Sequence, residues 1–515
     1  MLAVCKDRVV IVGAGIAGLV AAFALAARGL DVTLVERGPK PGGKMREIEI
    51  GSARIDSGPT VFTMRWVFDE LFAQAGLNFA DEVSLRPLNI LARHAWSDTA
   101  RFDLFADEQQ TVDAIGTLSG AAEAGRYRDF CTDSRRIFEI LEKPFLRSPR
   151  PSMANLIASS GFRGLADLPR IKPFSSMWNA LGRYFHDPRL RQLFGRYATY
   201  CGSSPFDAPA TLMLVAHVER EGVWSIEGGM HALARTLAGA AIRMGATIRC
   251  NETVTGVLTE NGEISGVALS SGERICASWV IMNADVCAIA GGLFGKEISR
   301  AVPGIPVKAR SLSAMTWSTV ARTSGFSLAR HSVFFSRDYR AEFDAIVGRS
   351  EMPQEPTVYV CAQDRDDTGT DDPESERLFI LVNAPPIGER HTFSPEEIDR
   401  CAQRTFAVLA RCGLTVQTRP EATQVTTPTD FNNLFPATGG ALYGRSSHGW
   451  MASFQRPGAR TKIPGLYLAG GSTHPGPGVP MAALSGRAAA ASLLADLNSI
   501  SRLRTTAMHG GTSMR

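Results

Sequence analysis

The sequence predicts an α/β protein in which a Rossmann-like, dinucleotide-binding domain is assembled from N-terminal, middle and C-terminal segments. Three observations predict it: a strand, glycine-rich turn and helix over residues 9–45, a glycine-led helix and strand over 228–249, and a strand, Gly/Pro-rich turn and helix over 463–491. Between these segments we expect a substrate domain that contains a sheet, and a helical subdomain that is a candidate for membrane docking.

The N-terminal segment carries the pattern of a dinucleotide site. Residues 9–12 are apolar and mostly valine, and Gly13, Gly15 and Gly18 follow at GxGxxG spacing before an alanine-rich helix. These glycines permit a tight turn, close approach of backbone N–H groups to a pyrophosphate, and close packing of helix on strand, while the helix N-terminus attracts phosphate. Glu36 ends the second strand about twenty residues later, where an acid meets a ribose hydroxyl.

The residues after Glu36 favour FAD over NAD. They read RGPKPGGKM, with the glycine pair Gly42 and Gly43 followed by Lys44. This extension resembles the one found in FAD-dependent amine oxidases and related flavoproteins. The resemblance implies that the glycine pair lets the chain lie along the cofactor and that the basic residue meets its phosphates; an NAD dehydrogenase has no need of the extension. A lone GxGxxG would leave another kind of glycine-rich loop open.

Composition excludes several other classes. The 515 residues suffice for two or three domains, and the net charge of +4 does not indicate a nucleic-acid partner. Nine cysteines without a C-x-x-C pair indicate neither a metal site nor a disulfide framework, which is typical of the cytoplasm. No apolar run approaches the roughly twenty residues of a transmembrane helix, and the first strand begins too early for a signal peptide.

The next segments are expected to lie beside the cofactor and then leave it. Residues 48–55 read as one strand, and the turn that holds Pro59 and Thr60 is suited to lie beside a flavin ring, although a plain strand-to-helix turn is the alternative. Residues 66–76 predict an amphipathic helix. A hairpin over 85–105 then begins a second region, which is mainly helical from 107 to about 200.

A basic and aromatic segment interrupts the helical region at residues 147–185. Apolar residues alternate there with arginine and lysine, and acids are nearly absent. This pattern is typical of a helix that docks on a membrane surface. Internal packing, or the wall of a substrate channel, is the alternative reading.

The middle of the chain returns to the cofactor fold and then builds a sheet. After the helix that follows Gly229, an antiparallel insertion turns at Asn261–Gly262 and leads to a strand at 279–282; in FAD folds the backbone near Val254 meets the adenine. Strands at 312–321, 332–335, 357–362 and 378–383 and a helix at 395–411 follow. The acidic run 363–377 reads as a solvated loop rather than a metal site.

The C-terminal segment closes the predicted site. A strand at 463–468, a Gly/Pro-rich turn and a helix from about Pro480 supply a second helix N-terminus for the flavin end, and residues after Ser499 are predicted to be a mobile tail. Arg456 is a candidate to polarise the flavin or bind a substrate hydroxyl, with a structural ion pair as the alternative. His474 is a candidate proton acceptor, with a turn residue bonded to backbone as the alternative.

The predicted segments are 1–84, 222–300 and 421–500 for the FAD-binding domain, 85–221 for the helical, membrane-associated region, 301–420 for the substrate-domain sheet, and 501–515 for the tail.

Taken together, the chain resembles the bacterial and fungal carotenoid (phytoene) desaturase family of FAD enzymes. The resemblance rests on GAGIAGL with ERGPKPGGKM, ARIDSGPTVFT, DPRLRQLF, GVWSIEGGMHAL and SFQRPGARTKIPGLYLAGGSTHPGPGVPMAALSGRAAA, and RLRQLFGRYATYCGSSPF points to the 1-hydroxycarotenoid 3,4-desaturase branch. The resemblance implies that the FAD contacts come from Gly13, Gly15, Ala17, Gly18, Glu36, Arg37, Gly43, Lys44, Met45, Pro59, Thr60, Val254, Gly470, Gly471, Val479, Pro480 and Met481.

The resemblance also implies a reaction and its partners. A carotenoid such as 1-hydroxyneurosporene would lose hydride to the flavin and a proton to a base or water, in a dry tunnel. The electron acceptor would be oxygen or a quinone, and the enzyme would be cytoplasmic and peripherally associated with the inner, photosynthetic membrane. Another amine-oxidase-type flavoenzyme, and a prenyl-binding escort protein of the same fold, are the alternatives. The oligomeric state is left open.

Overall fold

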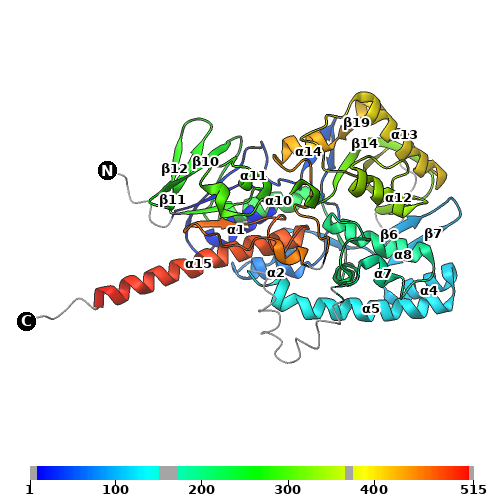
Figure 1. Cartoon of the computed structure of the whole chain (residues 1–515), viewed down its shortest axis with the longest axis horizontal. Coiled ribbons are helices and arrows are strands. Elements are labelled where there is room, and N and C mark those ends of the chain that lie inside the picture. Colours follow the sequence, from blue (N-terminus) through cyan, green and yellow to red (C-terminus); the bar gives the residue numbers. More distant parts are fainter. Residues whose placement is uncertain (1–7, 150–171, 173, 366–374, 450, 510–515) are drawn as a thin grey trace, which may run out of the picture.

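The computed structural model describes residues 8–149, 172, 174–365, 375–449 and 451–509. Figure 1 shows the whole chain as a ribbon. The central element of the fold is a five-stranded parallel sheet in the order β20-β13-β1-β2-β9. The strands come from all three predicted segments, which confirms the assembled α/β fold. Their bounds are β1 Arg8–Val12, β2 Asp31–Val35, β9 Thr247–Arg249, β13 Trp279–Met282 and β20 Leu466–Leu468.

The two faces of this sheet are covered differently. Val9 and Ile11 of β1 pack in the cluster that includes α1 (Ile16–Ala26), α10 (Met230–Arg243) and α15 (Val479–His509), whereas Val10 and Val12 pack against the antiparallel strands on the other face. Those strands are β10 Val254–Glu260, β11 Glu263–Leu269 and β12 Arg274–Cys276. Because neighbouring residues of a strand point to opposite faces, one apolar run serves both cores.

The second sheet has the order β18-β14-β17-β16-β15-β6-β7, with β19 also paired to β14. All its pairs are antiparallel except β15 with β6. α13 (Pro395–Arg411) covers one face and begins with a capping box formed by Ser394 and Glu397. The strands are β6 Ile90–Ala95, β7 Arg101–Phe105, β14 Ser313–Gly325, β15 His331–Phe334, β16 Val358–Ala362, β17 Glu376–Ala384, β18 Leu414–Gln417 and β19 Thr423–Thr426.

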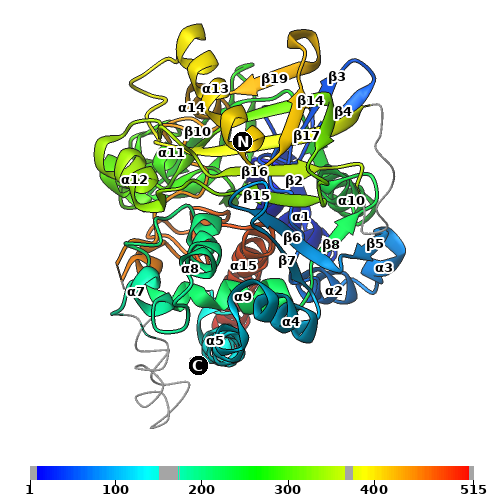
Figure 2. The same ribbon diagram turned by 90° about the vertical axis from the view of Figure 1, so that its right-hand side faces the viewer.

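A group of helices lies below this sheet in Figure 2 and shares an aromatic core with its strands. Stacked and edge-on rings fill this core, among them Phe130, Phe185 and Phe194. The elements are α4 Glu108–Ser119, α5 Ala121–Leu141, η1 Glu142–Leu146, α7 Met177–Leu181, α8 Pro188–Gly195, η2 Arg196–Cys201, η3 Ala210–Met213 and α9 Leu214–Arg220.

Most of the predicted membrane-docking segment, residues 150–171 and 173, lies outside the described residues. At its end, Met177 is buried in the helical core, whereas Phe174 is 79% exposed. Among the helices that the structure describes, none combines the length and the apolar character needed to cross a bilayer.

Shorter elements connect these layers. They are β3 Glu47–Ile50, β4 Ala53–Asp56, α2 Trp66–Ala73, α3 Phe79–Glu82, β5 Leu85–Pro87, β8 Trp224–Ile226, α11 Val286–Ala290, η4 Ile298–Ala301, η5 Val307–Ala309, α12 Tyr339–Phe343, η6 Asp344–Arg349, η7 Pro420–Ala422, α14 Pro428–Leu434 and η8 Ala452–Gln455.

Three sequence predictions need correction. Residues 48–55, predicted as one strand, form the hairpin β3–β4, because Gly51 adopts φ +58° and reverses the chain. The tail predicted after Ser499 continues as α15 to His509, because no Gly or Pro interrupts this stretch before Gly510. Finally, β19 joins the second sheet although 421–500 was assigned to the FAD-binding domain, because its pairing with β14 is set by distant residues.

Candidate functional site

The glycine-rich turn lies at the carboxyl end of β1, where β2 and β13 flank the strand on opposite sides. This is the position at which doubly wound sheets bind ligands. A Cβ atom on Gly18 would lie 2.1 Å from the Gly13 carbonyl oxygen, and one on Gly15 would lie 2.8 Å from Asn283 Nδ2. Asn283 also donates from Nδ2 to the Gly13 carbonyl at 3.1 Å. A residue larger than glycine therefore does not fit at Gly15 or Gly18 without a shift of these neighbours.

Glu36 reaches from the end of β2 across this turn. Its carboxylate accepts hydrogen bonds from the backbone N–H groups of Ala14 and Gly38, both at 2.7 Å. The backbone N–H of Glu252 donates to the Glu36 carbonyl at 2.9 Å, so the start of β10 at Val254 lies near the same corner. The acid, the glycine turn and the β10 strand are thus brought together as the sequence predicts.

The glycine pair of the second loop lies directly on the first loop. Gly42 donates its N–H to the Ala14 carbonyl at 2.8 Å, and a Cβ atom on Gly43 would lie 3.0 Å from Gly15 Cα. Two glycine-rich loops therefore touch through their backbones. This close approach is the reason for glycine at these positions.

The basic residues of this loop, Lys44 and Arg37, have separate contacts. The Lys44 ammonium donates to the Leu442 carbonyl at 2.6 Å, and burial lowers the pKa of Lys44. Arg37 is exposed and donates to the carbonyls of Asn433 and Leu434 at the end of α14. Met45 is buried in the core under the sheet.

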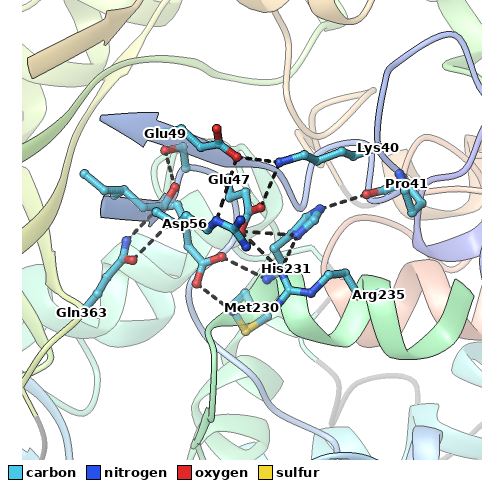
Figure 3. A network of polar contacts seen from close by, with 12 residues as sticks. Lys40, Pro41, Glu47, Glu49, Asp56, Met230, His231, Arg235 and Gln363 are labelled. Atoms are coloured by element: carbon cyan, nitrogen blue, oxygen red, sulfur yellow. Dashed lines mark hydrogen bonds and ion pairs between the residues drawn. The ribbon is translucent and has the colours of Figure 1, made fainter. Parts of the chain in front are cut away.

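A polar network fixes the second loop, through Pro41, to β4 and α10 (Figure 3). The buried Asp56 carboxylate accepts the backbone N–H groups of Met230 and His231 at 2.6 and 2.9 Å, so it occupies the N-terminus of α10. The His231 ring bonds the Pro41 carbonyl through Nε2 at 2.9 Å. Gln363 of the second sheet bonds the backbone of Asp56 twice. Burial raises the pKa of Asp56.

The C-terminal segment completes the enclosure. A Cβ atom on Gly486 of α15 would lie 2.2 Å from the Ala17 carbonyl, so α15 and α1 pack backbone to backbone. Gly470 follows β20, adopts φ +131° and donates its N–H to Ser485 Oγ. The first residues of α15, Val479, Pro480 and Met481, line a cavity. The partially positive end of a long helix therefore opens on that cavity.

This cavity of about 350 Å³ lies between three parts of the chain: the turn that holds Pro59 and Thr60 together with the start of α15, the second sheet, and the helical region. We call the turn that holds Pro59 and Thr60 the flavin-side turn, because the sequence predicts it beside the flavin ring. Pro59 and Thr60 line the cavity beside the start of α15. Its other walls are mainly apolar and include Val61, Met64, Leu141, Phe145, Leu146, Leu212, Leu214, Val215, Val218, Phe379, Leu381 and Phe454. Such a space suits a long apolar ligand that reaches the cofactor.

Arg456 lines the cavity and is almost fully buried. Its guanidinium donates to the carbonyls of Tyr443 at 3.2 Å, Gly471 at 3.1 Å and Arg445 at 2.5 Å. Within the described part of the chain it forms no ion pair, and these three backbone carbonyls hold its guanidinium. Burial lowers the pKa of Arg456 to about 10, which leaves it charged at neutral pH.

His474 directly precedes Pro475, which lines the cavity. Its Nε2 bonds the Phe145 carbonyl at 2.8 Å, and the Phe145 ring packs edge-on against it at 4.7 Å. Burial lowers the pKa of His474 to about 4, so the ring is neutral at pH 7. These contacts tie the Gly/Pro-rich turn to η1, and a role as proton acceptor stays a prediction.

The residues fit the adenine dinucleotide that the motifs predict. The glycine turn, the Glu36 carboxylate and the N-termini of α1 and α15 supply the backbone donors, the acid and the partial positive charges that such a group needs, and we call these parts the cradle. The backbone contacts at Gly18 and Gly486 leave no room there for a Cβ atom.

The sequence places Asp56 in the turn expected beside the flavin but does not reveal its bonds to α10. Sequence reasoning missed Asn283, which follows β13, and His231 of α10. Asn283 follows a predicted strand, and that position was the only available signal.

Most of the acidic run, residues 366–374, lies outside the described residues. At its flank, buried Glu376 is paired with Arg365 and Thr323. Among the residues that the structure describes, no three His, Cys, Asp or Glu side chains are grouped as metal ligands.

Two curated relatives that match almost the whole chain carry the same name. Hydroxyneurosporene desaturase of Rubrivivax gelatinosus is 52% identical over 509 residues, covering 99% of this chain and 97% of that protein. Hydroxyneurosporene desaturase of Cereibacter sphaeroides is 43% identical, covering 96% of this chain and 99% of that protein.

Solved structures share the fold at low identity. An oxidoreductase from Methanosarcina mazei matches with a TM-score of 0.59 and 16% identity, covering 93% of this chain and 99% of that one. Putrescine oxidase bound to putrescine matches with a TM-score of 0.57 and 15% identity, and the match covers 95% of this chain and 99% of that one. The model of flavin-containing amine oxidoreductases matches residues 16–494. The chain therefore belongs to the flavin-containing amine oxidoreductase family, in the group that holds the hydroxyneurosporene desaturases.

Proposed function

We infer that the protein is an FAD-dependent desaturase of carotenoid biosynthesis that acts on a CH–CH bond of a linear carotenoid. The observation that carries this inference is an apolar cavity that opens on the flavin-side turn and on the N-terminus of α15. The curated relatives that match almost the whole chain are hydroxyneurosporene desaturases. The specific substrate we propose is a 1-hydroxycarotenoid such as 1-hydroxyneurosporene, desaturated at C-3,4.

When bound, FAD supplies the hydride acceptor for the reaction. The chain itself binds and orients the polyene and keeps water away from it. The side chains of Leu141, Phe145, Leu212 and Val215 line the cavity and exclude water from it. The segments around Pro59 and Val479 hold the reacting end of the polyene against the cofactor, so that proximity rather than polar chemistry provides much of the rate.

We propose that Arg456 is the charged group that acts at the flavin end. Its three carbonyl bonds fix the guanidinium at the cavity wall. We expect Arg456→Met to lower kcat by about 100-fold, because a preorganised charge at the reacting centre is lost. Arg456→Lys, which keeps the charge, should lose less. Turnover is measured on protein shown by its absorption spectrum to hold FAD, and full turnover of FAD-loaded Arg456→Met would contradict this role.

We also propose that the protein works at the cytoplasmic surface of the inner membrane and docks there through residues 147–185. The basic and apolar pattern of this segment, the exposure of Phe174 and the insolubility of the substrate support docking. Oxygen or a membrane quinone would accept the electrons.

One assay tests the function. The protein is incubated with FAD and liposomes that carry 1-hydroxyneurosporene, in parallel with liposomes that carry phytoene, in air and anaerobically with a quinone. We expect a product with one further conjugated double bond, seen as a red shift of the polyene absorption, from the hydroxylated substrate, and protein that sediments with the vesicles. Conversion of phytoene alone would refute the substrate, and protein without flavin absorption would favour a lipid-binding escort.

A further inference from the structure

One buried polar cluster interrupts the apolar cavity. Arg196, Tyr200 and Glu219 all line the cavity, and they come from η2 and α9. Arg196 Nη1 donates to the Tyr200 hydroxyl at 3.0 Å, and that hydroxyl donates to Glu219 Oε1 at 3.1 Å. The Tyr197 hydroxyl donates to the other oxygen of Glu219. The carboxylate is thus satisfied by two tyrosines.

Arg196 has unused hydrogen-bonding capacity. In the described part of the chain its guanidinium forms no ion pair, and the bond to Tyr200 is its only side-chain hydrogen bond, although guanidinium carries five N–H donors. It retains accessible surface deep in the protein because it lines the cavity. Tyr200 and the ring of Tyr359 contact the guanidinium, but its remaining N–H donors have no acceptor among the described residues, so a ligand oxygen is a natural acceptor for them. Arg456 differs, because its donors are held by three carbonyls.

Arg196 lies close to the flavin-side turn. Its guanidinium lies 5.3 Å from the centre of the Tyr359 ring, and the Tyr359 hydroxyl bonds Thr60 Oγ1 at 2.6 Å. Thr60 belongs to the turn expected beside the flavin. The cation is therefore about one aromatic ring from the turn that is expected beside the flavin.

The chemistry of the proposed substrate demands a donor in this place. In a 1-hydroxycarotenoid that is desaturated at C-3,4, only one carbon separates the hydroxyl-bearing carbon from the reacting bond. The group that binds the hydroxyl must therefore lie beside the flavin end of the cavity and not at its far mouth. Arg196 satisfies this condition and has donors to spare.

We propose that Arg196, oriented by Tyr200 and Glu219, binds the substrate's terminal hydroxyl oxygen and so sets which carbon–carbon bond meets the flavin. This inference rests on the proposed function. Arg196 is the specificity-determining residue, and Tyr200 and Glu219 are positioning residues. A polyene that ends in an isopropylidene group offers no oxygen to Arg196 and leaves its spare N–H donors without an acceptor, so the site disfavours it.

The test compares two polyenes that differ in the hydroxyl. Dissociation constants of 1-hydroxyneurosporene and neurosporene are measured on the FAD-loaded protein by quenching of tryptophan fluorescence, together with turnover. Arg196→Met should raise the dissociation constant of 1-hydroxyneurosporene by about 10- to 100-fold, because a hydrogen bond to a charged donor is lost. The constant for neurosporene should stay within about twofold, and this difference is not expected from a merely structural role.

Arg191→Met is the matched control, because Arg191 donates to the Trp178 carbonyl and does not line the cavity. It should leave both constants unchanged. If Arg196→Met does not fold, Tyr200→Phe tests the inference, since it removes the hydroxyl that orients Arg196 and should raise only the constant for 1-hydroxyneurosporene, by several fold.

The outcomes separate the two claims. Equal weakening of both polyenes, or no change for 1-hydroxyneurosporene, overturns the role of Arg196. A wild-type protein that converts no hydroxylated carotenoid overturns the proposed function, whatever the binding preference of the variants.

Discussion

Gly18→Ala is expected to lower the affinity for FAD by more than about 100-fold. The new Cβ atom would lie 2.1 Å from the Gly13 carbonyl and 2.9 Å from Asn283 Nδ2, and the carbonyl is backbone that cannot rotate away. The turn must then open, which moves the α1 N-terminus away from the phosphates. Because a core of close-packed residues surrounds α1, the shift is also expected to cost about 1–3 kcal/mol of unfolding free energy.

Gly239→Ala is the matched control for this prediction. Gly239 lies in α10 of the same domain, and its added Cβ atom would meet only the flexible Arg243 Nη1, at 3.7 Å. We expect unchanged FAD affinity and a gain of about 0.5–1 kcal/mol, since alanine favours helix over glycine. Titration of apoprotein with FAD, followed by flavin fluorescence, measures both variants. A Gly18→Ala protein that binds FAD like the wild type would show that the turn is not the phosphate cradle.

Local chemistry explains why much of the cofactor fold is readable from the sequence. The run of residues 9–12, the glycine turn and the helix that follows are contiguous, and each has a conformational requirement that few residue types meet. The helix predicted over 395–411 has the observed bounds Pro395–Arg411, and the structure shows a capping box of Ser394 and Glu397 at its start, a signal made of neighbouring residues. Such signals lie within a few residues of the feature that they specify.

Contacts between distant residues were not readable. Asp56 meets the N-terminus of α10 174 residues later in the chain, and Gln363 meets Asp56 across 307 residues. Nothing near Asp56 distinguishes it from an ordinary turn aspartate. Arg196 was equally hidden, because in DPRLRQLFGRYATY it is one of several arginines and only the cavity singles it out. The hairpin β6–β7 was predicted, but its parallel pairing with β15 was not.

Three buried histidines are expected to make the protein sensitive to acid. Burial lowers the pKa of His94 and of His331 to about 3, and that of His474 to about 4, from an ordinary value of 6.5. Between pH 6.5 and these values the unfolded chain binds more protons than the folded chain, so stability falls as the pH falls. Each histidine contributes up to about 1.4 kcal/mol per pH unit. Glu342 opposes them, because burial raises its pKa to about 7.

His94→Phe isolates one of these contributions. His94 is 3% exposed and stacks on Phe335 at 5.9 Å, so a phenylalanine fits the aromatic surroundings but takes up no proton. From about pH 6 to pH 4 we expect the wild type to lose up to about 3 kcal/mol relative to the variant, because only its unfolded state gains the proton at this position. Urea unfolding of both proteins at several pH values measures the difference. Stability curves that run parallel over this range would show that His94 is not held neutral by burial, and the acid sensitivity would then have to arise from His331, His474 or the carboxylates.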